Sequence, residues 1–263
     1  MRAASIRQAL GRRGSARSRW RCPRTCTIPP AARPSSLWVP SAPVPTPTTI
    51  ELASGAEGRW TNGAGSRAVV CINGGTAAEN PGTWSASLEW LVGRLGPMHP
   101  SLGFLEVRYR IKSWRRLELC IEDGAAAVAA AQEAGAREVA VLGFSMGGAV
   151  AVHVAGDAAV STVIALAPWF YERLDVSPLD GRRLAVIHGA LDRGLPGVPG
   201  VAPELSRRGY ELARARGVDA DRTLISGAIH PIALRAPWGG LVPMPRAGRW
   251  AELVSEELTR FTA

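Results

Sequence analysis

The sequence predicts a doubly wound α/β fold, in which helices cover both faces of a mostly parallel β-sheet, with no large cap domain. Short apolar runs bounded by turn residues alternate with longer segments whose apolar residues have helical spacing, and this alternation is typical of parallel βαβ units. The runs are continuously apolar, as strands buried on both faces are. With 263 residues, 46% of them apolar, the chain can bury the core that such a sheet requires.

The elements can be assigned in order along the chain. Residues 48–60 offer one or two short strands around a glycine turn. The strands predicted after them are 66–73, 104–109, 138–144, 161–167, 183–189 and 222–226. The predicted helices are 83–95, 113–134, 146–155, 204–216 and 247–261. The ligand crevice of such a sheet lies beyond the carboxyl ends of its strands, so the turns after these strands are where chemistry is expected.

The basic residues are concentrated at the start of the chain. Residues 1–50 contain nine of the 31 basic residues and no acidic one, and the other 22 balance the 22 acidic residues. We therefore predict a disordered tail over 1–47, rich in Arg, Pro and Ser, and a nearly neutral domain over 48–263. Charge confined to a tail argues against a nucleic-acid-binding domain. The tail lacks the apolar segment of an export signal, while an organelle-targeting leader and a start codon assigned too early both stay open.

No apolar run is long enough for a membrane span, so none is predicted. Cys22 and Cys26 form a C-x3-C pair without a second pair of ligands, which is weak as a zinc site. Cys71 and Cys120 lie in apolar patterns and are expected to be buried and reduced. We accordingly expect a cytoplasmic protein without a metal or cofactor.

One strand-to-helix turn carries a catalytic motif. In EVAVLGFSMGGAV, residues 138–150, a buried strand leads through Gly143-Phe144-Ser145-Met146-Gly147 into a helix, and this fits the nucleophile elbow G-x-S-x-G. Glycines on either side let strand and helix approach closely, so that the serine hydroxyl projects from the edge of the sheet. The motif is weak alone, but its position between strand and helix makes Ser145 the predicted nucleophile.

A serine of this kind needs a base, and the sequence has four histidines. His230 is favoured because it lies in a loop after the last strand, where its ring can swing over Ser145. His188, at the end of a strand, is the main alternative. His99 is expected at the wrong end of the sheet, and His153 inside the helix that follows the elbow.

The base in turn needs a carboxylate to orient it. Asp192, just after the strand 183–189, is the favoured candidate, with Asp175 and Asp180 in the preceding loop as alternatives. The oxyanion of a tetrahedral intermediate needs preorganised amides. The amide of Met146 should supply one, and that of Gly75, or else Thr76, the other.

From about residue 66 onward the chain resembles the α/β-hydrolase superfamily, and it is similar to the dienelactone-hydrolase-like and carboxylesterase-like members. The motifs that carry this resemblance are Asn73-Gly74-Gly75, Gly143 to Gly148, His188 to Asp192 and Gly227 to His230. The resemblance implies eight strands, a Ser145-Asp192-His230 triad and metal-independent hydrolysis of carboxylic-ester-type bonds. Two features depart from the pattern, since many members have His-Gly at Asn73-Gly74 and the dienelactone hydrolases proper use a cysteine nucleophile.

The short segment between the strands 161–167 and 183–189 leaves no room for a helical cap, so an open site is expected. Aromatic residues are candidates for its walls: Trp84, Trp169, Phe170 and Tyr171. Cations near a strand end could attract a carboxylate-bearing substrate or simply be solvated: Arg108, Arg110 and Lys112.

The leading interpretation is a serine hydrolase of a small ester or thioester that forms an acyl-enzyme on Ser145. A non-catalytic protein of the same fold that binds a ligand or partner is an alternative, and so is an acyltransferase that uses the same residues. The expected partner is a small ester-like molecule. The sequence indicates neither its acyl chain nor the oligomeric state.

Overall fold

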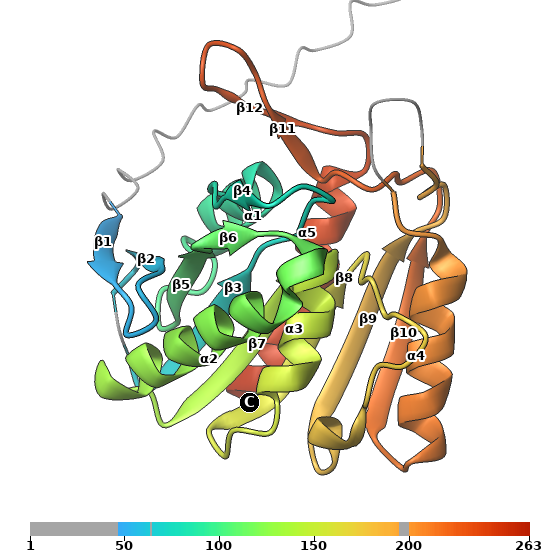
Figure 1. Ribbon diagram of the computed structural model, residues 1–263, viewed down its shortest axis with the longest axis horizontal. Coiled ribbons are helices and arrows are strands. Elements are labelled where there is room, and N and C mark those ends of the chain that lie inside the picture. The colour runs from blue at the N-terminus through green and yellow to red at the C-terminus, as the bar shows by residue number, and fades with distance from the viewer. Residues whose placement is uncertain (1–46, 64, 195–199) are drawn as a thin grey trace, which may run out of the picture. The chain divides into compact units, whose positions relative to one another are not determined.

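The computed structural model describes residues 47–63, 65–194 and 200–263 (Figure 1). The predicted tail over 1–47 lies outside these residues except for its last position, and so do Cys22 and Cys26. None of the helices in the described ranges is long and apolar enough to cross a lipid bilayer.

The core of the domain is an eight-stranded sheet, which confirms the predicted mostly parallel architecture. Its first two strands pair antiparallel and the remaining strands run parallel to one another. In spatial order the strands are β1 (Thr48–Glu51), β2 (Glu57–Thr61), β5 (Gly103–Arg108), β3 (Arg67–Ile72), β7 (Glu138–Phe144), β8 (Val160–Leu166), β9 (Arg183–Gly189) and β10 (Asp219–Ile225). The central strands are almost wholly buried, because their continuous apolar runs are covered on both sides.

Helices cover both faces of the sheet, as predicted (Figure 1). One face carries α1 (Ala86–Leu95) and α5 (Ala247–Thr262), and the other carries α2 (Leu117–Glu133), α3 (Met146–Val154) and α4 (Pro203–Ala215). The apolar stripes of these helices enclose two separate clusters of buried side chains, one on each side of the sheet. Burial of this apolar surface is the main favourable contribution to the stability of the fold.

Three elements start elsewhere than the sequence predicts. The helix expected from residue 83 begins at Ala86, because Ser85 caps it by accepting a hydrogen bond from Leu88 N–H at 3.3 Å. The helix expected from residue 113 opens as a 3-10 turn, η1 (Trp114–Arg116), capped by Ser113. Strand β10 begins at Asp219 rather than at 222. Its first three residues, Asp219 to Asp221, are exposed, buried and exposed in turn, so the sequence shows no apolar run that would mark the start of this edge strand.

Two small ribbons were not predicted, because their strands are too short to show a periodicity. They pair β4 (Asn80–Pro81) with β6 (Ile111–Lys112), and β11 (Ala233–Arg235) with β12 (Leu241–Pro243). Both lie beyond the sheet at the end where the parallel strands finish (Figure 1). Between β8 and β9 the chain forms only the 3-10 turn η2 (Ser177–Leu179), which confirms that no large cap domain is inserted there.

Cys71 and Cys120 are buried and free of disulfides, as the sequence predicts. Burial raises the pKa of the Cys71 thiol well above its ordinary value and the pKa of Cys120 to about 11. Because the thiolate is the reactive form, both residues are expected to behave as small apolar side chains.

Candidate active site

The order of the strands places a crevice near the middle of the sheet. The chain passes from β3 to β5 on one side and then returns to β7 on the other, so the loops after β3 and β7 diverge at the carboxyl ends of these strands. A cavity of about 470 Å³ lies there. The described residues that line it are Asn73, Gly74, Gly75, Lys112, Trp114, Phe144, Ser145, Met146, Trp169, Gly200, Val201 and His230.

Ser145 sits on a strained turn between β7 and α3. Its backbone angles are φ 57° and ψ −120°, a region that residues other than glycine rarely occupy. The neighbouring backbone holds it there, since Ser145 N–H donates to Leu166 O at 2.9 Å and Ser145 O accepts from Trp169 N–H at 2.9 Å. The turn thus has the geometry of a nucleophile elbow, with the serine side chain on the cavity wall.

The glycines of the elbow are required by close backbone contacts. A Cβ atom on Gly147 would overlap the carbonyl oxygen of Ile72 and lie 2.6 Å from that of Asn73. A Cβ atom on Gly143 would lie 2.6 Å from the carbonyl carbon of Gly147. Helix α3 can therefore start directly against the end of β3 only because these positions lack side chains.

Replacing Gly147 with alanine is expected to lower the free energy of unfolding by about 3 kcal/mol, because the methyl group meets backbone that cannot rotate away. Gly93→Ala is the matched control, since nothing lies within 4 Å of a Cβ atom there. In the last turn of α1 this change should instead stabilise by roughly 0.5–1 kcal/mol. Urea denaturation of both variants measures the difference, and equal stabilities would contradict this account of the elbow.

The loop after β3 runs directly over Ser145. A Cβ atom on Gly74 would lie 3.1 Å from the Cβ of Ser145, and one on Gly75 would lie 2.9 Å from Cε of Met146. Among the described residues, the N–H groups of Gly75 and Met146 have no hydrogen-bond partner in the protein. Two amides with free donors therefore border the serine.

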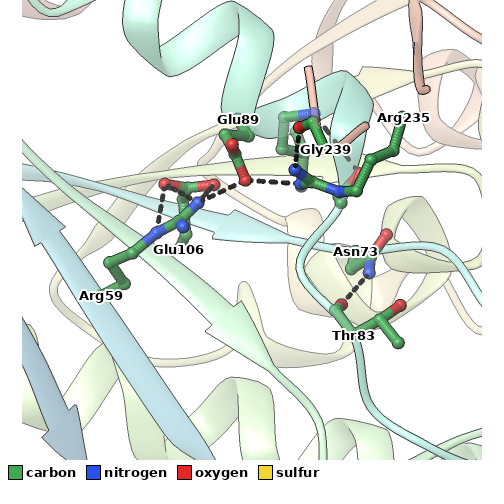
Figure 2. Close-up of polar contacts among 9 residues, drawn as sticks. Arg59, Asn73, Thr83, Glu89, Glu106, Arg235 and Gly239 are labelled. Atoms are coloured by element: carbon green, nitrogen blue, oxygen red, sulfur yellow. Dashed lines mark hydrogen bonds and ion pairs between the residues drawn. The ribbon is translucent and has the colours of Figure 1, made fainter. Parts of the chain in front are cut away.

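Asn73 holds this loop in place. Its Nδ2 donates to Thr83 O at 2.9 Å (Figure 2), and its Oδ1 accepts from Gly74 N–H at 2.7 Å. Its carbonyl oxygen accepts from the Tyr109 hydroxyl at 2.9 Å. Asparagine thus provides both a donor and an acceptor at the position where the sequence departs from the more common His-Gly pattern.

Thr76, the alternative to Gly75 as an amide donor, does not line the cavity. Its hydroxyl lies 2.8 Å from Ala78 O and 2.9 Å from Lys112 O, the two acceptors within reach of its single proton, and its carbonyl oxygen accepts from Trp114 N–H at 3.2 Å. These contacts attach the loop after β3 to the segment that follows β6. The geometry favours Gly75 over Thr76, because the Gly75 backbone packs on Met146.

His230 and Asp192 are joined in the same region. His230 Nδ1 lies 2.7 Å from Asp192 Oδ2, and the other carboxylate oxygen of Asp192 accepts from Val201 N–H at 2.9 Å. Asp192 is fully buried, while His230 lines the cavity with its ring centroid 5.0 Å from that of Phe144. Ser145 Oγ makes no hydrogen bond to any described residue, His230 included, whose ring bonds to Asp192. Such bonds often tighten only when substrate binds.

Asp192 is ionised at neutral pH. Burial by itself would raise its pKa, but the hydrogen bonds from the two histidines and from Val201 N–H outweigh burial, so its pKa lies below the ordinary value. The ionised carboxylate only accepts hydrogen bonds, so the proton shared with His230 belongs to Nδ1. By linkage, this lowered pKa adds stability above about pH 4 that is lost as the pH falls through the folded-state value.

His188, the main alternative to His230, is fully buried and does not line the cavity. Its Nε2 lies 3.1 Å from Asp192 Oδ2 and 3.0 Å from Val201 O. Both neighbours are acceptors, so Nε2 carries a proton. Nδ1 has no partner among the described residues, so a second proton there would be buried without an acceptor. A neutral His188 that donates to Asp192 fits this environment.

The remaining candidates have partners elsewhere. His99 Nε2 lies 2.8 Å from Ser255 Oγ, and His153 Nε2 lies 2.9 Å from the Tyr171 hydroxyl. Among the alternative acids, Asp175 accepts from Ser177 and Asp180 pairs with Arg216. None of the four lines the cavity. Of the candidate histidines, His230 is the one that lines the cavity with Ser145, and Asp192 is the candidate acid that bonds to it.

A set of contacts that the sequence did not indicate holds the loop of His230. The buried Ser87 Oγ accepts from Ile232 N–H at 3.1 Å and donates to Ala233 O at 3.2 Å. Just beyond, Arg235 pairs with Glu89 of α1 at 2.7 Å. Figure 2 shows this pair continuing into the sheet through a residue of β2, since Arg59 contacts both Glu89 and Glu106. These residues lie far apart in the sequence, and no motif marks them.

The aromatic residues only partly match the prediction. Trp169 lines the cavity together with Trp114, which was not predicted, and their ring centroids are 6.5 Å apart. The other three do not line it. Trp84 lies under Arg59, with the guanidinium carbon 4.4 Å from the ring centroid, Phe170 is buried in the core, and Tyr171 bonds to His153. Hydrophobicity alone did not separate core residues from cavity walls.

In the three described ranges, no cluster of three or more His, Cys, Asp or Glu side chains is arranged to hold a metal ion.

No protein-family model matches the sequence, and no curated protein matches it. Among solved structures, an esterase of Pyrobaculum calidifontis is similar, with 16% identity, a TM-score of 0.58 and coverage of 82% of this chain and 84% of that one. A dienelactone hydrolase-like promiscuous phosphotriesterase from metagenomic libraries has 16% identity and a TM-score of 0.57, covering 81% of this chain and 96% of that one. An α/β serine hydrolase homologue from Coxiella burnetii has 16% identity and a TM-score of 0.56, covering 84% and 98%.

The similarity extends over most of this chain and of each of these structures. At this level of identity the similarity concerns the fold. The protein has the fold of the α/β-hydrolase superfamily.

Proposed function

We propose that the protein is a serine hydrolase that cleaves a small ester or thioester through an acyl-enzyme on Ser145. The observation that carries this proposal is the pairing of a strained serine with a histidine in one cavity, where the histidine bonds to a buried carboxylate at 2.7 Å. A merely structural turn would require the glycines, but it would not require a serine opposite an Asp-His pair.

In the acylation step, Ser145 Oγ attacks the carbonyl carbon of the substrate while His230 Nε2 takes the hydroxyl proton. Asp192 stabilises the imidazolium and keeps the ring oriented through Nδ1. The negative charge on the carbonyl oxygen falls between the N–H groups of Gly75 and Met146, at the amino end of α3. The imidazolium then protonates the leaving alcohol or thiol, and the acyl-enzyme remains.

In the deacylation step, His230 removes a proton from water, and the resulting nucleophile attacks the acyl carbon. The tetrahedral intermediate uses the same two amides, and collapse returns the proton to Ser145 Oγ. Side chains and backbone amides perform every step in this scheme, so it calls on no metal or cofactor. The proposed enzyme is therefore a metal-independent hydrolase of carboxylic-ester-type bonds.

Labelling with a fluorophosphonate probe tests the proposal directly, because such a probe reacts with a serine activated by a neighbouring base. We expect a single adduct on the peptide that contains Ser145, located by mass spectrometry, and hydrolysis of p-nitrophenyl acetate or butyrate by the full-length protein. Heat-denatured protein is the control. A native protein that neither labels nor hydrolyses either ester would instead be a binding protein of this fold.

We also predict that His188 is a positioning residue for the triad. His188→Leu removes a donor to Asp192 and to Val201 O, so we expect roughly tenfold lower kcat with a nearly unchanged KM, and a loss of about 1–3 kcal/mol in stability. His188→Gln, whose amide can still donate, should retain most of the activity. Steady-state kinetics of both variants with p-nitrophenyl butyrate provide the measurement. If His188→Leu abolished labelling of Ser145 as completely as loss of the base, His188 rather than His230 would be the base.

A further inference from the structure

The chain contains a single lysine. Of its 31 basic residues, 30 are arginines and one is Lys112. Lys112 lies in β6, beside the loop that runs over Ser145, and it lines the same cavity as Ser145 and His230. The only lysine ammonium group of the chain, which is more compact than an arginine guanidinium, therefore lies at the candidate active site.

The contacts of Lys112 connect it to the loop after β3, which carries the Gly75 amide proposed for the oxyanion. Its Nζ donates to Thr83 Oγ1 at 2.8 Å, and the carbonyl oxygen of Thr83 accepts from Asn73 Nδ2 at 2.9 Å. The Lys112 carbonyl oxygen lies 2.9 Å from the hydroxyl of Thr76, which is in the loop after β3. The ammonium is thus fixed by a neutral hydroxyl, and two of its three N–H donors remain available.

Lys112 also lacks a counter-charge. The two neighbouring arginines are paired, Arg108 with Glu57 and Arg110 with Asp123 at 2.6 Å, whereas Lys112 forms no ion pair with any described carboxylate. Among the described residues that line the cavity, only Lys112 and His230 can carry a charge, and both charges would be positive. Partial burial lowers the pKa of Lys112, as expected for an ammonium without an anion beside it.

We propose that Lys112 binds a carboxylate of the substrate, so that the enzyme prefers esters carrying one free carboxylate to neutral esters of the same size. This inference rests on the proposed function of the site. A single ammonium matches a single negative charge, which favours a monoanionic carboxylate over a dianionic phosphate. The rings of Trp114 and Trp169 provide an apolar wall for the carbon chain between the carboxylate and the ester.

Matched pairs of esters test the preference in the full-length protein. One pair varies the acyl part, with p-nitrophenyl butyrate against mono-p-nitrophenyl glutarate, and the other varies the leaving group, with phenyl butyrate against 4-carboxyphenyl butyrate. We expect kcat/KM for the anionic member of at least one pair to be about 10- to 100-fold higher. In Lys112→Met the anionic and neutral members of that pair should have nearly equal kcat/KM, because the anionic ester loses more than the neutral one, and Lys112→Arg should keep most of the advantage.

Equal kcat/KM values for anionic and neutral members of both pairs in the wild-type protein would overturn the proposal. An equal loss for both members in Lys112→Met would also overturn it, because Lys112 would then merely support the loop after β3.

A binding measurement separates this inference from the proposed function. Calorimetric titration of the Ser145→Ala protein with monomethyl glutarate needs no turnover, and dimethyl glutarate is the neutral control. We expect the monoanion to bind about tenfold or more tightly than the diester, and the advantage to be lost in the Ser145→Ala, Lys112→Met double variant. If binding follows this pattern but the wild-type protein hydrolyses no ester, the carboxylate site stands and the hydrolase proposal fails. If the two ligands bind equally, the carboxylate site is refuted whether or not esters are hydrolysed.

Discussion

Replacing Ser145 with alanine is expected to lower kcat for p-nitrophenyl butyrate by about 10⁴-fold or more and to abolish labelling by a fluorophosphonate. The variant lacks the only group of the protein that bonds to the acyl carbon in the proposed mechanism. The remaining cavity can still bind the ester and present the N–H groups of Gly75 and Met146, so a small residual rate over that in water is expected.

The fold of this variant should be intact, because Ser145 Oγ makes no hydrogen bond to any described residue. Alanine at this strained position keeps the same backbone hydrogen bonds to Leu166 and Trp169. Ser101→Ala is the matched control, since Ser101 is exposed and lies outside the cavity. Both variants should unfold at the same urea concentration as the wild-type protein, and only Ser145→Ala should be inactive. Unchanged hydrolysis by Ser145→Ala would disprove the acyl-enzyme mechanism.

Replacing Asp192 with asparagine is expected to lower kcat at neutral pH by about 10⁴-fold. In the wild-type protein Asp192 Oδ2 accepts from both His230 Nδ1 and His188 Nε2. If the amide oxygen of the new asparagine keeps the bond to Val201 N–H, the NH2 group of that asparagine takes the place of Oδ2 and faces both histidines. His230 must then offer Nδ1 as an acceptor, which moves its proton to Nε2. That tautomer cannot accept the proton of Ser145.

The NH2 group would also face the Nε2 proton of buried His188, which brings two donors together without an acceptor. Asp192→Asn should therefore lower the free energy of unfolding by about 1–3 kcal/mol as well. Asp180→Asn is the matched control, because this rival aspartate pairs with Arg216 outside the cavity. Kinetics at pH 7 and urea denaturation of both variants provide the measurements. Nearly normal kcat in Asp192→Asn would mean that the carboxylate does not orient His230. Loss of activity in Asp180→Asn would point to Asp180 rather than Asp192 as the acid of the triad.

Much of the architecture follows from local features of the sequence. The continuous apolar runs of β3, β7 and β8 mark strands buried on both faces, and the burial of these strands confirms this. The position of Ser145 also follows from local features, because glycines at 143 and 147 between a strand and a helix permit a turn that other residues would block. The edge strand β10 and the two small ribbons were predicted poorly or not at all. Strand β10 begins with exposed charged residues, and the strands of the ribbons have too few residues to show a period.

The sequence by itself thus determined the layered α/β architecture, the elbow with Ser145 and a short list of partners that includes His230 and Asp192. Only the tertiary structure decided which members of that list meet, that His188 supports the carboxylate, and that Lys112 rather than Arg108 or Arg110 lines the cavity. The physical reason is that residue type and periodicity report local conformation and burial. The contact between two side chains depends on strand order and on the loops that return to one edge of the sheet, and these arise from packing between segments far apart in the chain.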